Sequence, residues 1–189
     1  VYLISANTCV NSISNSVVVT VNPLPTLSSG LALEGTCSGT SFTYTPTSGT
    51  TGTSFSWTRA AVNGISNAAA NGTGAITETL TNTTNAAITV SYVYSLSANG
   101  CSNPATFTVN KAINPIPALN SDLNPAAICS GTAFTYTPSS NVTGVQFNWA
   151  RAAVDGINNG AISGTGNINE NLLNTTSGSV NVIYQYSLS

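Results

Sequence analysis

Charged side chains, which carry most acid–base and ion-binding chemistry, are scarce in this sequence. Its 189 residues include three Lys and Arg, five Asp and Glu, and no His. An arginine and a glutamate nevertheless recur with one spacing, first as Arg59 and Glu78 and then as Arg151 and Glu170. Catalysis by paired carboxylates needs a second acid near the first, and no second acid recurs with either glutamate. We therefore predict an ion pair at the rim of each core, and no catalytic residue.

The four cysteines form two sets related by an offset of 92 positions, Cys9 with Cys101 and Cys37 with Cys129. In a chain without His and with few acids, cysteines favour disulfides over metal binding or thiol catalysis. Two pairings are open. Cys37 could bridge to Cys101 within one repeat, or it could bridge across a junction to the equivalent of Cys101 in the following repeat. Either bridge implies an oxidising or extracellular compartment.

No ligand set for a metal, a cofactor or nucleic acid is evident in the sequence. Calcium takes six to eight oxygens, and each expected domain junction has at most one carboxylate nearby. A phosphate-binding surface needs clustered Lys and Arg, which three basic residues cannot form. A lysine-to-asparagine cross-link is not expected, because the only lysine, Lys111, corresponds to Val19 in the preceding copy. The apolar runs are short and interrupted, so no membrane span is expected in this segment.

These residues lie in a repeat with a period of 92 residues. The sequence FSWTRAAV at 55–62 returns as FNWARAAV at 147–154, and no insertion or deletion interrupts the offset. A constant period of this length predicts similar domains in a head-to-tail array. Two prolines in each of the segments 22–25 and 114–117 stiffen the chain, which places the junctions there. The chain is expected to be a piece of a longer polypeptide. Its predicted parts are the last strands of a truncated repeat, a complete repeat, and a third repeat without its last strand, at residues 1–24, 25–116 and 117–189.

Within the complete repeat, apolar residues alternate with polar ones, as in Phe42 and Tyr44 or Phe55 and Trp57. Alternation with period two, interrupted by turn residues, predicts an all-β sandwich with immunoglobulin-like strand order. A short first strand is expected within residues 26–36. The other predicted elements are a strand at 17–21, in a hairpin with the preceding residues, and loops at 63–73 and 155–165.

This strand order also indicates where single residues lie. Trp57 and Trp149 could stack against a glycan, but their alternation with polar neighbours places them on the inward face, and we predict that both belong to the core. Cys37 and Cys101 lie in turns at opposite poles of the predicted domain. A disulfide allows a Cα separation of roughly 7 Å at most, so this geometry suggests the bridge across the junction.

Several short motifs add a family resemblance. They are CSGTxFTYTP at 37–46 and 129–138, FxWxRAAV at 55–62 and 147–154, GTG at 72–74, YxYSL at 92–96 and NGC at 99–101. Together they resemble the PKD-like, immunoglobulin-like tandem repeats of giant cell-surface adhesins in Bacteroidota, the SprB-type gliding adhesins. The resemblance implies export by the type IX secretion system and exposure at the outer membrane. It supplies no catalytic or cofactor-binding residue.

On this basis we expect a structural segment of a long extracellular filament, acting as a stalk or tether in adhesion or gliding. Its expected partners are neighbouring repeats of the same chain and the outer-membrane gliding or secretion machinery. In the rival hypothesis each repeat binds surface polysaccharide through exposed Tyr, Asn and Thr, with the loops 63–73 and 155–165 as contact regions. An enzyme is the weakest interpretation, since the sequence has no His, carboxylate pair or activated nucleophile.

Overall fold

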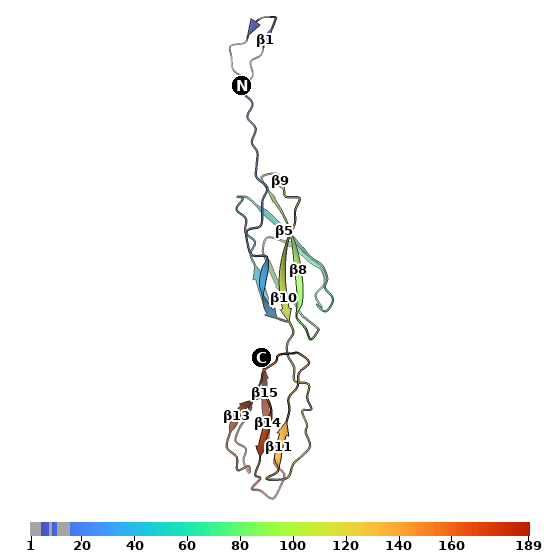
Figure 1. Cartoon of the computed structure of the whole chain (residues 1–189), viewed down its shortest axis with the longest axis vertical. Helices are drawn as coiled ribbons and strands as arrows, with labels where there is room; N and C mark the ends of the chain where they lie inside the picture. Colours follow the sequence, from blue (N-terminus) through green and yellow to red (C-terminus); the bar gives the residue numbers. More distant parts are fainter. Residues whose placement is uncertain (1–4, 8, 11–15) are drawn as a thin grey trace.

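The computed structural model of the chain describes residues 5–7, 9–10 and 16–189, and its regular elements are all β-strands. Figure 1 shows a small N-terminal hairpin, a drawn-out connection and two β-domains that follow one another along the long axis of the molecule. The prediction of an all-β, immunoglobulin-like fold is confirmed. No helix among the described residues is long and apolar enough to cross a membrane.

Residues 25–116 form a sandwich of two β-sheets, hereafter the complete unit. The larger sheet has the order β3 (Ala32–Cys37), β10 (Phe107–Asn114), β8 (Ile88–Ala98), β5 (Ser54–Arg59) and β6 (Ala70–Thr73), with β9 (Cys101–Ser102) paired to β8. The smaller sheet pairs β4 (Ser41–Tyr44) with β7 (Ile76–Thr79). These pairings are antiparallel except that of β3 with β10, which is parallel.

The core of the complete unit lies between the two sheets, because each strand turns alternate side chains inward. Its most deeply buried members are aromatic and aliphatic: Ile76, Leu80, Val90, Tyr92, Tyr94, Val109 and Ile113. Trp57 is buried with them and meets the edge of Tyr92 at a centroid distance of 5.6 Å. Each such side chain contributes about 1.5–3 kcal/mol on burial, so strand alternation supplies most of the stabilisation of the sandwich.

Residues 70–73, which the sequence placed within a loop, form the edge strand β6 and pair with β5. Gly72 lies opposite Trp57 in this pairing, and a Cβ at Gly72 would lie 2.7 Å from the indole ring. The glycine thus makes room for the tryptophan. Gly164 does the same for Trp149 in β13 (Ile162–Thr165), a strand that also falls in a predicted loop. Glycine and asparagine are depleted in strands, which is why the pattern indicated loops here.

Residues 117–189, hereafter the third unit, repeat this architecture in part. The strands are β11 (Ala133–Tyr136) paired with β14 (Ile168–Asn171), and β12 (Phe147–Arg151) between β13 and β15 (Tyr184–Leu188). The sequence stops at Ser189, before the positions equivalent to β10. Residues 180–183 form no strand, although their equivalents in β8 pair with β10. Among the described residues, 180–183 therefore have no neighbouring strand like the one that β10 gives their equivalents.

At the N-terminus, β1 (Ser5–Ala6) and β2 (Cys9–Val10) form a hairpin with the register of the β8–β9 hairpin. Asn7 and Asn99 hold equivalent left-handed turn positions, with φ of 48° and 50°. The prediction of a strand at 17–21 was wrong, since these residues are unpaired. A strand forms only beside a strand that pairs with its backbone, and none of the described residues pairs with 17–21. The part of that hairpin at 11–15 lies outside the described residues.

Candidate functional site

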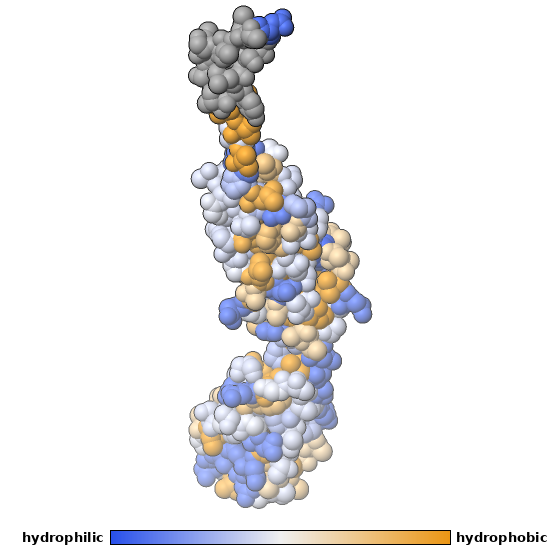
Figure 2. Space-filling view, turned by 45° about the horizontal axis from the view of Figure 1, so that its top comes forward, coloured by the Kyte–Doolittle hydropathy of each residue, from blue (hydrophilic) through white to orange (hydrophobic). Residues whose placement is uncertain are grey.

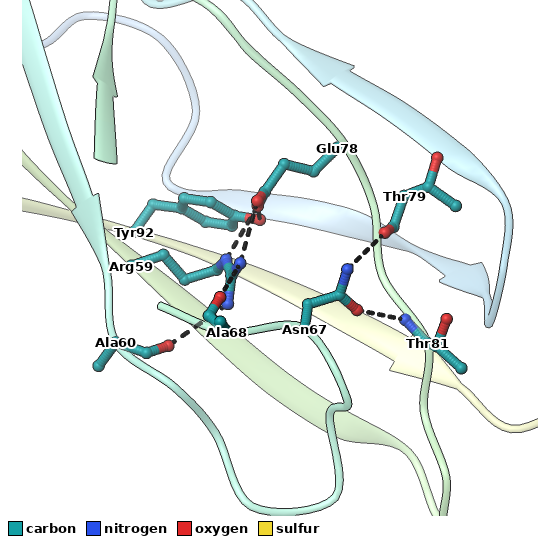
Figure 3. A network of polar contacts seen from close by, with 8 residues as sticks. All are labelled: Arg59, Ala60, Asn67, Ala68, Glu78, Thr79, Thr81 and Tyr92. Atoms are coloured by element: carbon teal, nitrogen blue, oxygen red, sulfur yellow. Dashed lines mark hydrogen bonds and ion pairs between the residues drawn. The ribbon is translucent and has the colours of Figure 1, made fainter. Parts of the chain in front are cut away.

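Arg59 and Glu78 form a charged cluster in the complete unit, together with Tyr92 (Figure 3). Arg59 donates from Nε to Glu78 Oε2 at 2.9 Å and from Nη2 to Oε1 at 3.0 Å, a bidentate ion pair. The Tyr92 hydroxyl donates to the same Oε2. Other guanidinium protons go to the carbonyl oxygens of Ala60 and Ala68, at 3.5 and 2.7 Å. Charge-assisted bonds of this kind are about twice as strong as neutral ones.

Three strands from both sheets place these side chains. Arg59 is the last residue of β5, Glu78 lies in β7 and Tyr92 in β8, each at an inward position of its strand. Arg59 is only 2% exposed. Leaving such a guanidinium without its carboxylate costs several kcal/mol, so the cluster holds the two sheets together.

Arg151, Glu170 and Tyr184 repeat the cluster in the third unit, with ion-pair distances of 2.9 and 3.0 Å and a hydroxyl-to-carboxylate distance of 2.5 Å. The Arg151 guanidinium lowers the pKa of Glu170 below its ordinary value, more than burial raises it. The hydrogen bond to Glu170 in turn raises the pKa of Arg151. Burial, and then the bond to Glu170, raise the pKa of Tyr184.

These pKa shifts decide what chemistry the cluster can do. In the complete unit, burial and then the hydrogen bond to Glu78 raise the pKa of Tyr92. A general acid or base works best with a pKa near the operating pH, whereas the shifted groups here move away from neutrality. The geometry suits a structural cross-brace. Sequence reasoning missed the tyrosine as a member of the cluster, because alternation indicated its inward face but not the partner of its hydroxyl.

Two asparagines fasten loops to the same sandwich. Asn67 donates to the Thr79 carbonyl at 3.0 Å and accepts from the Thr81 amide at 2.9 Å (Figure 3). Asn82 is buried and donates to the Ile113 carbonyl at 2.8 Å, which ties a loop to the end of β10. Both asparagines recur in the third unit at the offset of 92 residues. That recurrence is the signal by which sequence reasoning could have found them.

The parallel strands β3 and β10 are the first and last strands of the complete unit. Their paired residues are Ala32 with Asn110, Leu33 with Lys111, Thr36 with Ile113 and Cys37 with Asn114. Lys111 is buried, and its ammonium donates to the Glu34 carbonyl and lies 5.0 Å from the centroid of the Phe42 ring. The chain enters the unit towards the start of β3 and leaves from the end of β10, at opposite ends (Figure 1).

The proline-rich segment before the complete unit is hydrogen-bonded to that unit. Asn22 donates to the Asn99 carbonyl at 3.0 Å, and Asn103 donates to the Pro25 carbonyl at 2.8 Å. On the domain side, the Asn99 carbonyl and the Asn103 side-chain amide both belong to the turn that contains β9. Two prolines already restrict this segment, and the two bonds fix its direction against the domain. The junction is therefore a docked connection.

The part of the chain that the structure describes contains no disulfide. Cys37, Cys101 and Cys129 are free, and the side chain of Cys9 is not among those described. Cys37 lies beside the last residue of β10, whereas Cys101 lies beside the opposite end of β8. Strand β8 has 11 residues, and a strand of that length spans about 33 Å. A bridge between Cys37 and Cys101 within one repeat does not fit this fold.

The third unit is open where the complete unit carries β3 and β10. A groove of about 860 Å³ runs there, and apolar side chains of both sheets line it, among them Ile168, Leu172, Val182, Tyr184 and Tyr186. Across the described residues, no three His, Cys, Asp or Glu side chains come together as a metal site would require.

Two stretches of the chain match the same protein family. A family model described as a PKD-like domain matches residues 34–117 and, separately, residues 126–188. The first match covers most of the complete unit and the second covers most of the third unit, so each structural unit corresponds to one copy of the domain. No curated protein matches the chain.

Proposed function

Because the chain belongs to the PKD-like domain family, we propose that it is a load-bearing segment of a long extracellular filament. The filament is an adhesin on the surface of a gliding bacterium of the Bacteroidota, exported by the type IX system and attached to the outer membrane. The segment has a structural and not a catalytic role. Its direct partners are the neighbouring repeats, and the gliding or secretion machinery holds the attached end of the filament.

The observation that carries this proposal is the parallel pairing of β3 with β10. Tension along the filament pulls the start of β3 one way and the end of β10 the other way. In a parallel pair this load acts along the strands, so the paired residues from Ala32–Asn110 to Cys37–Asn114 resist together. If both strands were pulled from the same end, their bonds would break one after another. Lys111 adds a side-chain bond across the same pair.

The junctions support the same role. Asn141 of the third unit donates to Asn85 of the complete unit at 2.5 Å, a direct contact between the two domains. We further propose a disulfide across each junction, from Cys37 to the equivalent of Cys101 in the following repeat. Cys37 is paired with Asn114, while the equivalent asparagine at the preceding junction, Asn22, is bonded to the turn that contains Cys101. In this arrangement Cys37 and the equivalent of Cys101 in the following repeat lie on either side of Asn114.

Single-molecule pulling in two directions tests the load-bearing role. In one variant, handles attached at Thr26 and Ile116 load the complete unit from end to end. In a second variant, handles at Gly30 and Thr108 load β3 and β10 from the same end. All four positions are exposed, and a side chain at Gly30 meets no atom within 4 Å. Native cysteines are replaced by serine in both variants.

We expect the end-to-end direction to require the clearly higher unfolding force. Equal forces in the two directions would contradict the proposal, because the parallel pair would then have no special part in resisting tension. Lys111→Met, which removes the cross-strand bond and keeps an apolar stem, should lower the force in the end-to-end direction alone.

No structural observation favours the rival polysaccharide-binding role. That role requires aromatic side chains in a row on a solvent-exposed face. In the complete unit Tyr44, Tyr92 and Tyr94 are buried. Part of each predicted contact loop, at 70–73 and 162–165, is an edge strand that includes the glycine packed against tryptophan.

A further inference from the structure

All three basic side chains of the sequence are buried. The chain has three Lys and Arg in total. Arg59 and Arg151 are each 2% exposed, and Lys111 is 6% exposed. In most folded proteins Lys and Arg lie at the surface and are almost never fully buried. The surface of the described residues therefore presents no cationic side chain.

The charged side chains that do reach the surface are acids, namely Glu34, Asp122 and Asp155. Most of the surface visible in Figure 2 has intermediate hydropathy, between smaller hydrophilic and hydrophobic areas. A partner that recognises Lys or Arg thus finds neither on the folded units. One class of partner recognises a single basic side chain with little regard to its neighbours: proteases of the trypsin type, whose S1 pocket holds a carboxylate.

The peptide bonds that follow the three basic residues have a sequence that such proteases accept. Alanine follows each basic residue, at positions 60, 112 and 152. A small residue leaves room in the active site, whereas a proline there would restrict the backbone on both sides of the bond. Nothing in the local sequence therefore protects these three bonds once the chain is unfolded.

In the folded units, strand pairing protects the three bonds. A peptide that binds in an extended form pairs its backbone with its receptor as an added strand does. Lys111 already pairs with Leu33 on one side and with Val90 on the other. Arg59 and Arg151 are the last residues of β5 and β12, and each of these strands lies between two others. Cleavage therefore requires these pairings to be lost first.

The basic side chains are also bonded inside the fold. The Arg59 guanidinium donates to the Glu78 carboxylate and to the Ala68 carbonyl (Figure 3). The Lys111 ammonium donates to the Glu34 carbonyl. An S1 pocket can take either side chain only after these bonds have broken, and a buried ion pair is costly to break. The opening that admits a protease is thus unfolding of the unit and not fraying at its ends.

We propose that Arg59, Lys111 and Arg151 are concealed cleavage sites for proteases specific for Lys and Arg, closed in the folded unit and available after unfolding. The reaction is hydrolysis. At the first site the C–N bond between Arg59 and Ala60 breaks, the hydroxyl of one water goes to the Arg59 carbonyl carbon, and a proton goes to the Ala60 nitrogen. A unit opened by tension or damage is cut, while folded neighbours stay intact. Such gated cleavage operates whether or not the chain bears load.

Digestion of the reduced 189-residue chain with trypsin, followed by mass spectrometry, tests the proposal. In denaturing urea we expect cuts after all three basic residues. The fragments are then residues 1–59, 60–111, 112–151 and 152–189. In native buffer the complete unit should stay uncut while the unfolded chain is consumed.

Gly49 offers a matched pair of control variants. It lies in an exposed bend between β4 and β5, and a side chain there meets no atom within 4 Å. Gly49→Arg puts a basic residue on the surface, and the folded chain should be cut there at least about a hundredfold faster than after Arg59, because a stable domain is only rarely open. Gly49→Gln has a long side chain without charge and should add no cut. Cutting after Arg59 or Lys111 in native buffer as fast as after position 49 of Gly49→Arg would overturn the proposal.

A second measurement tests whether unfolding controls the cut. Cleavage follows the population of the open form when opening and closing are fast. In a urea concentration just sufficient for measurable cleavage, Gly72→Ala should speed the cuts after Arg59 and Lys111 about tenfold, through overpacking against the tryptophan. The cut after Arg151 should keep its rate. Unchanged rates after Arg59 and Lys111 would also overturn the proposal, since cleavage would then not pass through the unfolded unit.

Discussion

The complete unit and the third unit share nearly the same sequence pattern. Among the described residues, only the complete unit has the strand β10. Their charged clusters are alike, with the same ion-pair distance of 2.9 Å in both. Their cores are not alike, because Tyr92 is fully buried whereas its equivalent Tyr184 is partly exposed. The cluster is therefore determined locally by β5, β7 and β8 or their equivalents, while closure of the core depends on the last strand.

The aromatic rings show how far the effect of the missing strand extends. Within one sheet, the contact of tryptophan with tyrosine is the same in both units, at interplanar angles of 73° and 71°. Between the sheets, Phe42 meets Tyr92 edge-on at 70°, but Phe134 and Tyr184 stack at 25°. The ring contact within one sheet is therefore the same in both units, whereas the ring contact between the two sheets has a different geometry in the third unit.

Removing the charge of the glutamate tests whether the cluster is local. Glu78→Gln leaves Arg59 buried without its counter-charge, and we expect a loss of about 3–5 kcal/mol in the free energy of unfolding of the complete unit. Glu170→Gln should cost the third unit a similar amount. Denaturant unfolding reports each unit separately when the tryptophan of the other unit is replaced by phenylalanine. A much smaller loss in the third unit would show that the cluster depends on the closed core.

Filling the space beside the tryptophan should destabilise the two units to different extents. A Cβ at Gly72 or Gly164 would lie 2.7 or 2.6 Å from the indole, so the ring must move. We expect Gly72→Ala to cost about 1–3 kcal/mol, the usual range for overpacking. Gly164→Ala should cost less, because the open groove leaves the third unit room to adjust. Thermal melts of the two variants check this order, and equal losses would show that the strain stays within the sheet.

The smallest expected effect is a loss of stability of the third unit at acidic pH. The folded protein holds the pKa of Glu170 below its ordinary value of 4.5, chiefly through Arg151. Its stabilising contribution is therefore present above about pH 4.5 and is lost as the pH falls through the lowered pKa. Unfolding followed by Trp149 fluorescence between neutral and acidic pH should show this decline. In Glu170→Gln the decline should be flatter, and an unchanged slope would assign the effect to other groups.

The sequence indicated much of the fold because period-two alternation is a local signal and the offset of 92 residues shows the same alternation twice. Arg59 and Glu78 stood out by recurring in a chain with few charges, and the structure brings them together. The strand at 70–73 was not predictable from composition, since Gly72 is there to admit a tryptophan from the neighbouring strand. The strand at 17–21 was predicted and does not form, because a strand needs partners that its own residues cannot supply.

The unbroken offset of 92 residues has a consequence for the gene as well as for the protein. Recombination between equivalent codons of two neighbouring repeats adds or removes 92 residues wherever the crossover falls. Each remaining junction then keeps an asparagine like Asn22 before its prolines and a turn like that at Asn99 to receive it. The number of domains in the array can thus change in whole repeats during evolution, without any intermediate that has a broken domain.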